Sequence, residues 1–109
     1  MQPVYRRILL KLSGEALGSG TCGGSCIDQG VLAALCRKIA HMTEMGVQVA
    51  LVCGGGNIWR GRTVPGMQRT RADQAGMLAT VINGLALQDE LVRQGVEAEL
   101  FTAFEMGPV

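Results

Sequence analysis

The chain has 109 residues, of which 48% are hydrophobic and 17% are charged. That much apolar material predicts a folded core and argues against a disordered chain. The formal net charge of +1 and the aromatic content of 4% favour neither binding to nucleic acid nor binding to a membrane. We therefore expect one domain that binds any anion through locally placed side chains and backbone N–H groups.

The first half of the chain predicts a strand, a helix and a second strand. Residues 7–12, RILLKL, form an apolar strand, and a glycine-rich loop follows it. Asp28 is placed to cap a helix, and Gly46 is placed to end it. Residues 47–53, VQVALVC, predict a strand apolar enough to be covered on both faces. The helix is predicted from apolar residues at helical spacing, namely Leu32, Leu35, Ile39 and Met42.

The second half predicts another helix, from about Ala72 to Gln94, and a third strand over residues 96–104. Gly95 is placed to end the helix. Small residues on this helix permit another backbone to approach closely. We favour tight packing on the sheet as their explanation, and a contact between subunits is the alternative. These small residues are Gly76, Ala79, Thr80, Asn83, Gly84 and Ala86.

The alternation of strands and helices predicts an α/β fold with a parallel sheet and right-handed crossovers. Ligands bind such sheets beyond the carboxyl ends of the strands, so the two glycine-rich loops should face one site. Three strands are few for a fold of this class. We therefore expect residues 1–109 to be part of a larger domain.

The cysteines favour free thiols in a reducing cytoplasm. Cys22 and Cys26 flank a glycine pair, a spacing open to a metal or a disulfide, but there is no CxxC pair and His41 is the only histidine. Cys36 and Cys53 fall in predicted helix and strand, where a free cysteine behaves as a small hydrophobic residue. The N-terminal apolar run is short and interrupted by a lysine, so it predicts no signal peptide or membrane span.

Residues 51–66, LVCGGGNIWRGRTVPG, are typical of a phosphate-binding loop. Trp59 stands where G-x-G-x-x-G requires its last glycine, which argues against a dinucleotide-binding fingerprint. Residues 56–63 match a P-loop except that Arg62 replaces the lysine, and the two side chains are not interchangeable. Pro65 and Gly66 also turn the chain where a P-loop would enter a helix, so we do not favour that design.

A design with two loops fits the residues better. Lys11 lies late in an apolar strand, where its ammonium is costly unless it reaches a polar site or solvent. Ser13 offers a hydroxyl, and Gly14 lets the backbone approach an anion. The Gly54–Gly56 run supplies backbone N–H groups from the second strand, with Arg60 in the same loop. Positive charge and amides at one edge suit phosphoryl transfer.

The motifs KLSGEAL, GGGNIWRG and DQAGMLATVINGLALQD resemble those of bacterial UMP kinases, in the amino-acid-kinase superfamily, from about Tyr5 onward. The resemblance implies a three-layer α/β/α fold, incomplete here, and the reaction of ATP with UMP to give ADP and UDP with Mg²⁺. It places Lys11 and Arg60 as catalytic. The resemblance implies ATP contacts from Lys11, Ser13, Gly14, Gly56 and Arg60.

The resemblance also places Gly55 and Asp73 in contact with UMP. An alternative for Asp73 is a charge near a helix N-terminus capped by Thr70. The family implies a homohexamer activated by GTP and inhibited by UTP, and the alternative function is a non-catalytic nucleotide- or oxyanion-binding relative. Family members continue beyond the third strand, so we expect the 109-residue chain alone not to turn over UMP.

Overall fold

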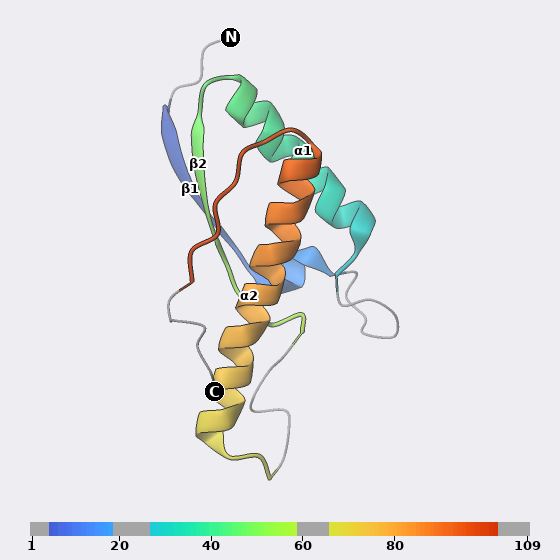
Figure 1. Cartoon of the computed structure of the whole chain (residues 1–109), viewed down its shortest axis with the longest axis vertical. Coiled ribbons are helices and arrows are strands. Elements are labelled where there is room, and N and C mark those ends of the chain that lie inside the picture. Colours follow the sequence, from blue (N-terminus) through green and yellow to red (C-terminus); the bar gives the residue numbers. More distant parts are fainter. Residues whose placement is uncertain (1–4, 19–26, 59–65, 103–109) are drawn as a thin grey trace.

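The computed structural model describes residues 5–18, 27–58 and 66–102. Two strands and two long helices alternate along these segments, with one short 3₁₀ helix after the first strand (Figure 1). The strands pair in parallel, and α1 connects them, so the predicted α/β alternation is confirmed to this point. The elements are β1 (Arg7–Leu12), η1 (Gly14–Leu17), α1 (Gln29–Glu44), β2 (Gln48–Cys53) and α2 (Arg69–Arg93).

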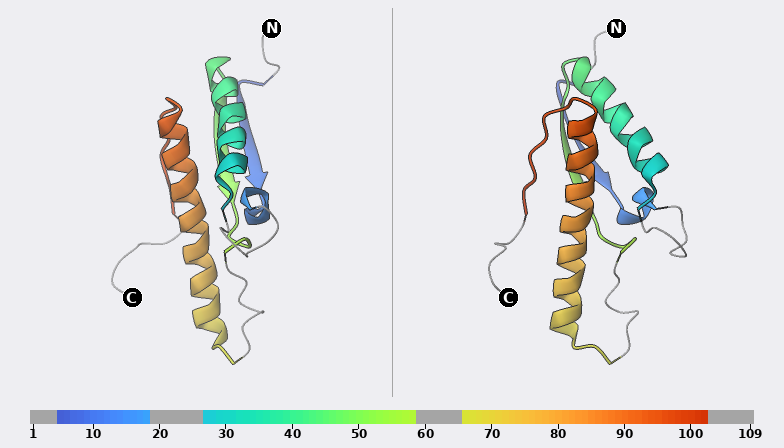
Figure 2. Two further views of the ribbon diagram at one scale, coloured as in Figure 1. Left: turned by 90° about the vertical axis from the view of Figure 1, so that its right-hand side faces the viewer. Right: turned by 45° about the vertical axis from the view of Figure 1, so that its right-hand side comes forward.

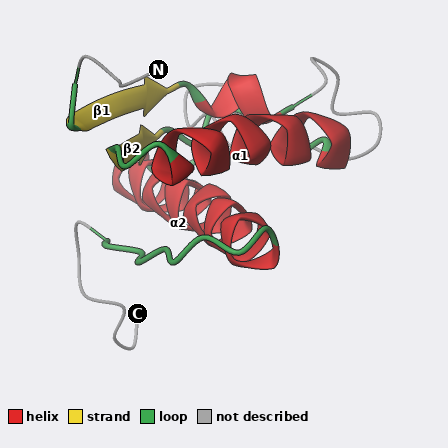
Figure 3. Cartoon of the chain, turned by 90° about the horizontal axis from the view of Figure 1, so that it is seen from above, coloured by secondary structure: helices red, strands yellow, loops and turns green. Residues whose placement is uncertain are grey.

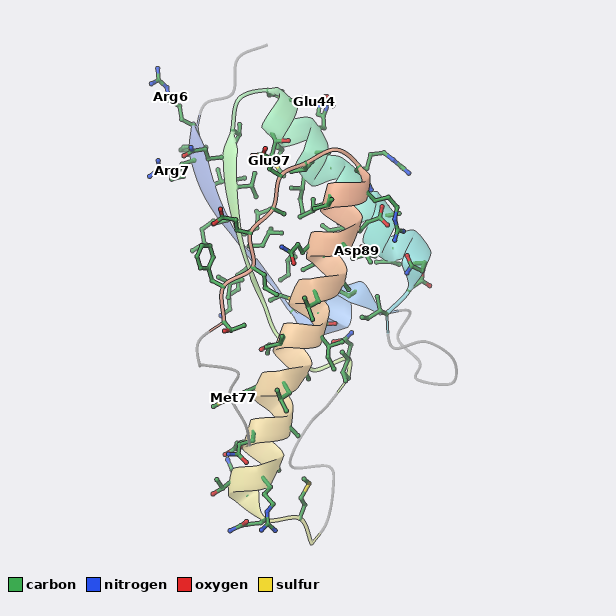
Figure 4. All side chains as sticks on the ribbon, viewed as in Figure 1. Arg6, Arg7, Glu44, Met77, Asp89 and Glu97 are labelled. Atoms are coloured by element: carbon green, nitrogen blue, oxygen red, sulfur yellow. The ribbon has the colours of Figure 1, made fainter. Side chains whose placement is uncertain are left out.

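The two strands run in register, from Arg7 opposite Gln48 to Leu12 opposite Cys53. Arg7 Nε donates a hydrogen bond of 2.7 Å to Gln48 Oε1 at the start of the pair, where Figure 4 labels Arg7. Alternate residues are partly buried, and those near the carboxyl ends pack on the helical core. The opposite face is open, because Leu9 is 67% exposed and Val52 is 51% exposed.

The expectation that β2 is covered on both faces is therefore wrong for the described residues. The helices supply one layer against the sheet, and no described segment supplies a second layer on the open face (Figure 3). The apolar sequence of β2 nevertheless has a physical cause, since a strand with two apolar faces is typical of a sheet buried on both sides.

The ends of α1 follow from capping chemistry. Asp28 Oδ1 accepts a 3.0 Å hydrogen bond from the backbone N–H of Val31, as predicted for an N-cap. At the other end Gly46 adopts a φ of 87°, and its N–H donates to the carbonyl of Thr43 at 3.0 Å. The N–H of Val47 donates to the carbonyl of Met42 at 3.2 Å, which completes a Schellman motif before β2.

The helix α2 begins earlier than predicted, at Arg69. Gln68 is its N-cap and makes no side-chain cap hydrogen bond, so the suggested cap at Thr70 is wrong. Its C-terminus agrees with the prediction, because Gly95 has a φ of 88° after Arg93. The N-terminal turns of α2 extend past the carboxyl ends of the strands in all three ribbon views of Figures 1 and 2.

The core lies between the two helices and the covered face of the sheet. It continues into partly buried side chains of both strands, including Val49 and Leu51. The fully buried cluster contains Leu17, Leu32, Cys36, Ile39, Leu87 and Leu91. Because η1 supplies Leu17, the loop after β1 is anchored to the same core as the helices.

The predicted third strand is wrong within its described part, residues 96–102. This segment runs back along α2, on the side away from α1, and forms no strand (Figures 1 and 3). Gln88 Nε2 donates to the carbonyl of Ala98 at 3.0 Å, and Leu100 packs over Gly84. Contacts with α2 therefore hold residues 96–102 in place, although their alternating apolar pattern is typical of a strand. Residues 103 and 104 lie outside the described residues.

Candidate functional site

The loops after β1 and β2 leave the sheet at the same edge, as the parallel pairing requires (Figure 1). The backbone N–H of Gly54 donates to the carbonyl of Leu12 at 3.1 Å and extends the ladder one step beyond β2. The N–H of Ile58 then donates to the carbonyl of Gly55 at 3.0 Å, which closes a turn. The segment Gly54–Asn57, which contains the first three residues of this turn, is called the glycine turn below.

Gly14 is buried against the glycine turn. A Cβ atom at Gly14 would lie 2.7 Å from the backbone nitrogen of Gly56 and from Asn57 Oδ1, and 2.8 Å from the carbonyl oxygen of Gly54. Two of these three atoms belong to the backbone, so no side-chain rotation would make room. The structure thus brings together parts of the two loops that the sequence predicted to face one site.

Gly55 lies against the middle of α2. A Cβ atom at Gly55 would lie 2.8 Å from the Cβ of Ala79 and 3.0 Å from the backbone nitrogen of Thr80. Ala79 is 1% exposed. Two of the predicted small positions on α2 therefore receive the glycine turn, which follows β2, rather than a strand of the sheet.

Asn57 and Asn83 form a buried pair that the sequence analysis did not single out as part of the site. Asn57 Nδ2 donates to Asn83 Oδ1 at 3.1 Å, and Asn83 Nδ2 donates to Asn57 Oδ1 at 2.6 Å. Asn83 Nδ2 also donates to the carbonyl of Gly54 at 2.8 Å. The signal was present, because Asn83 lies four residues from both Ala79 and Leu87, on the buried side of α2.

Lys11 and Ser13 flank the end of β1 and are both exposed. Lys11 alternates with Leu9 on the open face of the sheet, and no described residue forms an ion pair with its ammonium group. The carbonyl of Ser13 accepts the N–H of Ala16 at 3.0 Å and starts η1. Both side chains are thus accessible to a ligand at the carboxyl edge.

Asp73 lies on α2 and is exposed. Its carboxylate is 3.5 Å from Arg69 Nε, in a solvent-exposed pair at i,i+4 spacing. Because α2 begins at Arg69, Asp73 lies beyond the first turn, which holds no acidic residue. The alternative explanation of Asp73 as an N-terminal helix charge is therefore wrong.

Asp73 lines an open groove of about 700 Å³ between β2, α2 and residues 100–102. The groove is mainly apolar, and Thr80, the neighbour of Gly55, lies on the same wall. Cys53, the last residue of β2, lines it too, so the groove approaches the glycine turn. Figure 4 labels Met77, another residue that lines the groove.

Arg60, Trp59 and Arg62 lie outside the described residues, as do Cys22 and Cys26. Within the described part of the chain, no three metal-ligating side chains gather into a group. The helices described here include none that is long and apolar enough to cross a membrane.

Cys36 and Cys53 are free, as predicted. Burial, and to a smaller extent the nearby Glu90 carboxylate, raise the pKa of the Cys36 thiol from 9.0 to about 11. Burial also raises the pKa of the Cys53 thiol. Cys53 Sγ donates to the carbonyl of Gly54 at 3.3 Å, so this thiol supports the glycine turn as a protonated donor.

Comparisons with known proteins agree with the resemblance drawn from the motifs. The chain is 48% identical over 110 residues to uridylate kinases of Mycobacterium sp. strains KMS and JLS, which covers 99% of this chain and 42% of each relative. The chain thus spans about two fifths of the length of these curated relatives.

Solved structures give the same result. The UMP kinase of Bacillus anthracis aligns with a TM-score of 0.73 and 38% identity, over 83% of this chain and 37% of that one. The UMP kinase of Ureaplasma parvum aligns with a TM-score of 0.74 and 39% identity, over 84% of this chain and 40% of that one. Residues 6–108 match the amino acid kinase family, and the chain belongs to that family.

Proposed function

We propose that the protein containing this chain is a UMP kinase that transfers a phosphoryl group from ATP to UMP. The bond between the γ-phosphorus of ATP and its bridging oxygen breaks, and a phosphate oxygen of UMP forms the new bond, giving ADP and UDP. The observation that carries this proposal is the packing of Gly14, Gly55 and Gly56 at one sheet edge, in a chain similar to uridylate kinases. Such an edge presents backbone amides to phosphates.

Each proposed role follows from the chemistry of the residue. Lys11 neutralises negative charge on the phosphoryl group in transfer, and its exposed position at the carboxyl edge permits that. Ser13 and Gly14 hold phosphate oxygens of ATP through a hydroxyl group and a backbone N–H. Gly56 and Arg60 bind ATP phosphates as well, and Arg60 also stabilises the transition state.

The UMP side of the site is formed by Gly55 and Asp73. The backbone of Gly55 contacts UMP, and the Asp73 carboxylate accepts hydrogen bonds from ribose hydroxyl groups. The groove that Asp73 lines is open and continues to the end of β2, which supports a small ligand entering there. Mg²⁺ bound together with ATP would supply further positive charge beside the phosphates that these residues hold.

The wider biology of the protein is part of the same proposal. We place it in the cytoplasm, in pyrimidine nucleotide biosynthesis, as a homohexamer with GTP as activator and UTP as inhibitor. Exposed apolar residues along α2 support association between copies of the chain, because a large apolar surface favours burial. These residues are Met77, Leu78, Ile82, Leu85 and Val92.

The test compares two substitutions in the longest natural chain that contains these residues. Lys11→Ala should abolish ADP release while UMP binding is retained, because the lysine acts on the transferring group. Asp73→Asn should raise the KM for UMP with a smaller effect on kcat. The matched controls are Lys38→Ala on α1 and Asp89→Asn, an exposed acid that pairs with Arg93 at 2.6 Å.

Two results would count against the proposal. Nucleotide binding without any UMP-dependent ADP release by the unsubstituted protein would favour the non-catalytic alternative. If Lys11→Ala and Asp73→Asn changed only the stability and left turnover and the KM for UMP at the values of their controls, the site assignment would be wrong. The 109-residue chain by itself should show no turnover in the same coupled assay, because it spans 42% of the length of the uridylate kinases that it matches.

A further inference from the structure

Asn83 is fully buried in the interior of a long helix, where a polar side chain is unfavourable without partners. Its neighbours at i±4, Ala79 and Leu87, are apolar. Asn83 satisfies its amide with bonds to Asn57 and to the Gly54 carbonyl. All three bonds end on the glycine turn, so among the described residues the hydrogen bonds of this side chain link α2 to that turn alone.

The bond to Gly54 fixes the direction of one peptide group. The carbonyl oxygen of Gly54 accepts from Asn83 Nδ2 at 2.8 Å and from Cys53 Sγ at 3.3 Å, so two donors hold it toward the protein. No cis peptide bond occurs among the described residues. In a planar trans peptide the N–H points opposite to the C=O, so the N–H of Gly55 points away from Asn83.

The N–H of Gly55 has no acceptor among the described residues. The next residue is Gly56, whose nitrogen would lie 2.7 Å from a Cβ atom at Gly14. An N–H held in this way is a preorganised donor, which costs no reorientation when an anion arrives. Without the hydrogen bonds to the Gly54 carbonyl, the Gly54–Gly55 peptide would be free to rotate, and the Gly55 N–H would no longer be held in one direction.

We propose that Asn83 is a positioning residue of the phosphate site: it locks the Gly54–Gly55 peptide so that the Gly55 N–H faces the phosphate of the bound nucleotide. This inference rests on the proposed function for the identity of the nucleotide. Asn57 holds the Asn83 amide in the required orientation through the reciprocal pair. Its Oδ1 also lies near Gly14, so the same lock keeps the two loops together.

The test substitutes Asn83→Asp in the longest natural chain that contains these residues. The carboxylate has nearly the same shape but cannot donate to the Gly54 carbonyl. The matched control is Gln88→Glu, which removes a 3.0 Å amide-to-carbonyl bond from the same helix, far along it from the glycine turn. Asn57→Asp is a second variant, because it keeps the bond between Asn83 and Gly54 and loses only one bond of the pair.

The first readout does not need catalysis. With selective ¹⁵N-glycine labelling, the Gly55 amide proton of the unsubstituted protein should move downfield as UMP is added. The shift should be absent in Asn83→Asp at the same UMP concentration and present in Gln88→Glu. A Gly55 signal that ignores UMP in the unsubstituted protein, or that shifts equally in Asn83→Asp, overturns the inference.

The second readout is kinetic. Asn83→Asp should lower kcat/KM for UMP by about 100-fold, the typical effect of a displaced donor. Asn57→Asp should lower it less, and Gln88→Glu should leave it unchanged. Equal losses in Asn83→Asp and Gln88→Glu would overturn the positioning role. If the unsubstituted protein showed the amide shift but no turnover, the proposed kinase function would fail while the inference about Asn83 stood.

Discussion

The two long helices of this chain bury different kinds of residue. The helix α1 buries Leu32, Cys36 and Ile39 at helical spacing, as an amphipathic helix does. The helix α2 buries Asn83 and Glu90 together with small and apolar residues, while Ile82 is 48% exposed. Buried polar residues and exposed apolar residues on one helix cannot be explained by the packing of this core alone.

The difference follows from what each helix contacts. One side of α1 meets only the core, so its burial pattern is simply apolar. The helix α2 meets the core, the glycine turn and residues 96–102 in succession, and each contact requires a different residue type. The close approach of Gly55 favours a small residue at Ala79, and the Leu100 side chain favours glycine at Gly84, while Asn83 bonds a carbonyl. Contacts with other segments thus decide the residues of α2, where packing on the core decides those of α1.

The largest expected effect comes from the core side of α1. Leu32→Ala should lower the free energy of unfolding by about 3 kcal/mol, because it leaves a cavity at a residue that is 2% exposed. Leu78→Ala on α2, where the side chain is 45% exposed, is the control and should cost far less. Urea unfolding of both variants measures the contrast, and equal losses would contradict the account of the two helices.

The next largest effect is a change of the unfolding free energy with pH, due to the buried thiol of Cys36 between the helices. The pKa of the Cys36 thiol is about 11 in the folded chain and close to 9.0 in the unfolded one. Because the folded pKa is raised, the stability due to this thiol is complete below pH 9 and falls as the pH rises toward 11. Two pKa units correspond to about 2–3 kcal/mol.

Cys36→Ala should remove that contribution, so its unfolding free energy should fall less steeply between pH 9 and pH 11. Denaturant unfolding across this pH range, for the variant and the unsubstituted chain, gives the comparison. Cys53→Ala serves as a control at a residue that is only partly buried. Parallel curves for the Cys36→Ala variant and the unsubstituted chain would show that the thiol of Cys36 does not titrate as inferred.

Local signals predicted the first half of the fold well. The pattern of residues 7–12 and the capping residues Asp28 and Gly46 specify β1 and α1 almost to the residue, because capping is decided by near neighbours. The third strand was not predictable in the same way. Its alternation suits a strand, yet contacts to Gly84 and Gln88 on α2 decide where residues 96–102 lie.

The site divides along the same line. Glycines and a lysine after apolar strands predicted that two loops meet at one edge, and the structure brings Gly14, Gly55 and Gly56 together there. The contribution of Asn83 was missed, since it depends on which side of α2 faces the turn. Its position in step with Ala79 and Leu87 was the available clue. The roles of Lys11, Arg60 and Asp73 stay predictions.

The smallest effect is expected at Ile82, on the exposed side of α2. Its neighbour Val81 lies on the buried side and gives the contrast. Ile82→Ser should change the free energy of unfolding by less than about 0.5 kcal/mol, because the side chain is half exposed and the two residues have similar helix propensities. Val81→Ser, at 7% exposure, should cost clearly more. Both are measured at low protein concentration, where association contributes little.

A loss above 1 kcal/mol for Ile82→Ser that persists on dilution would mean that this side is already covered within the chain. A loss that appears only at high concentration would mean that another copy covers it.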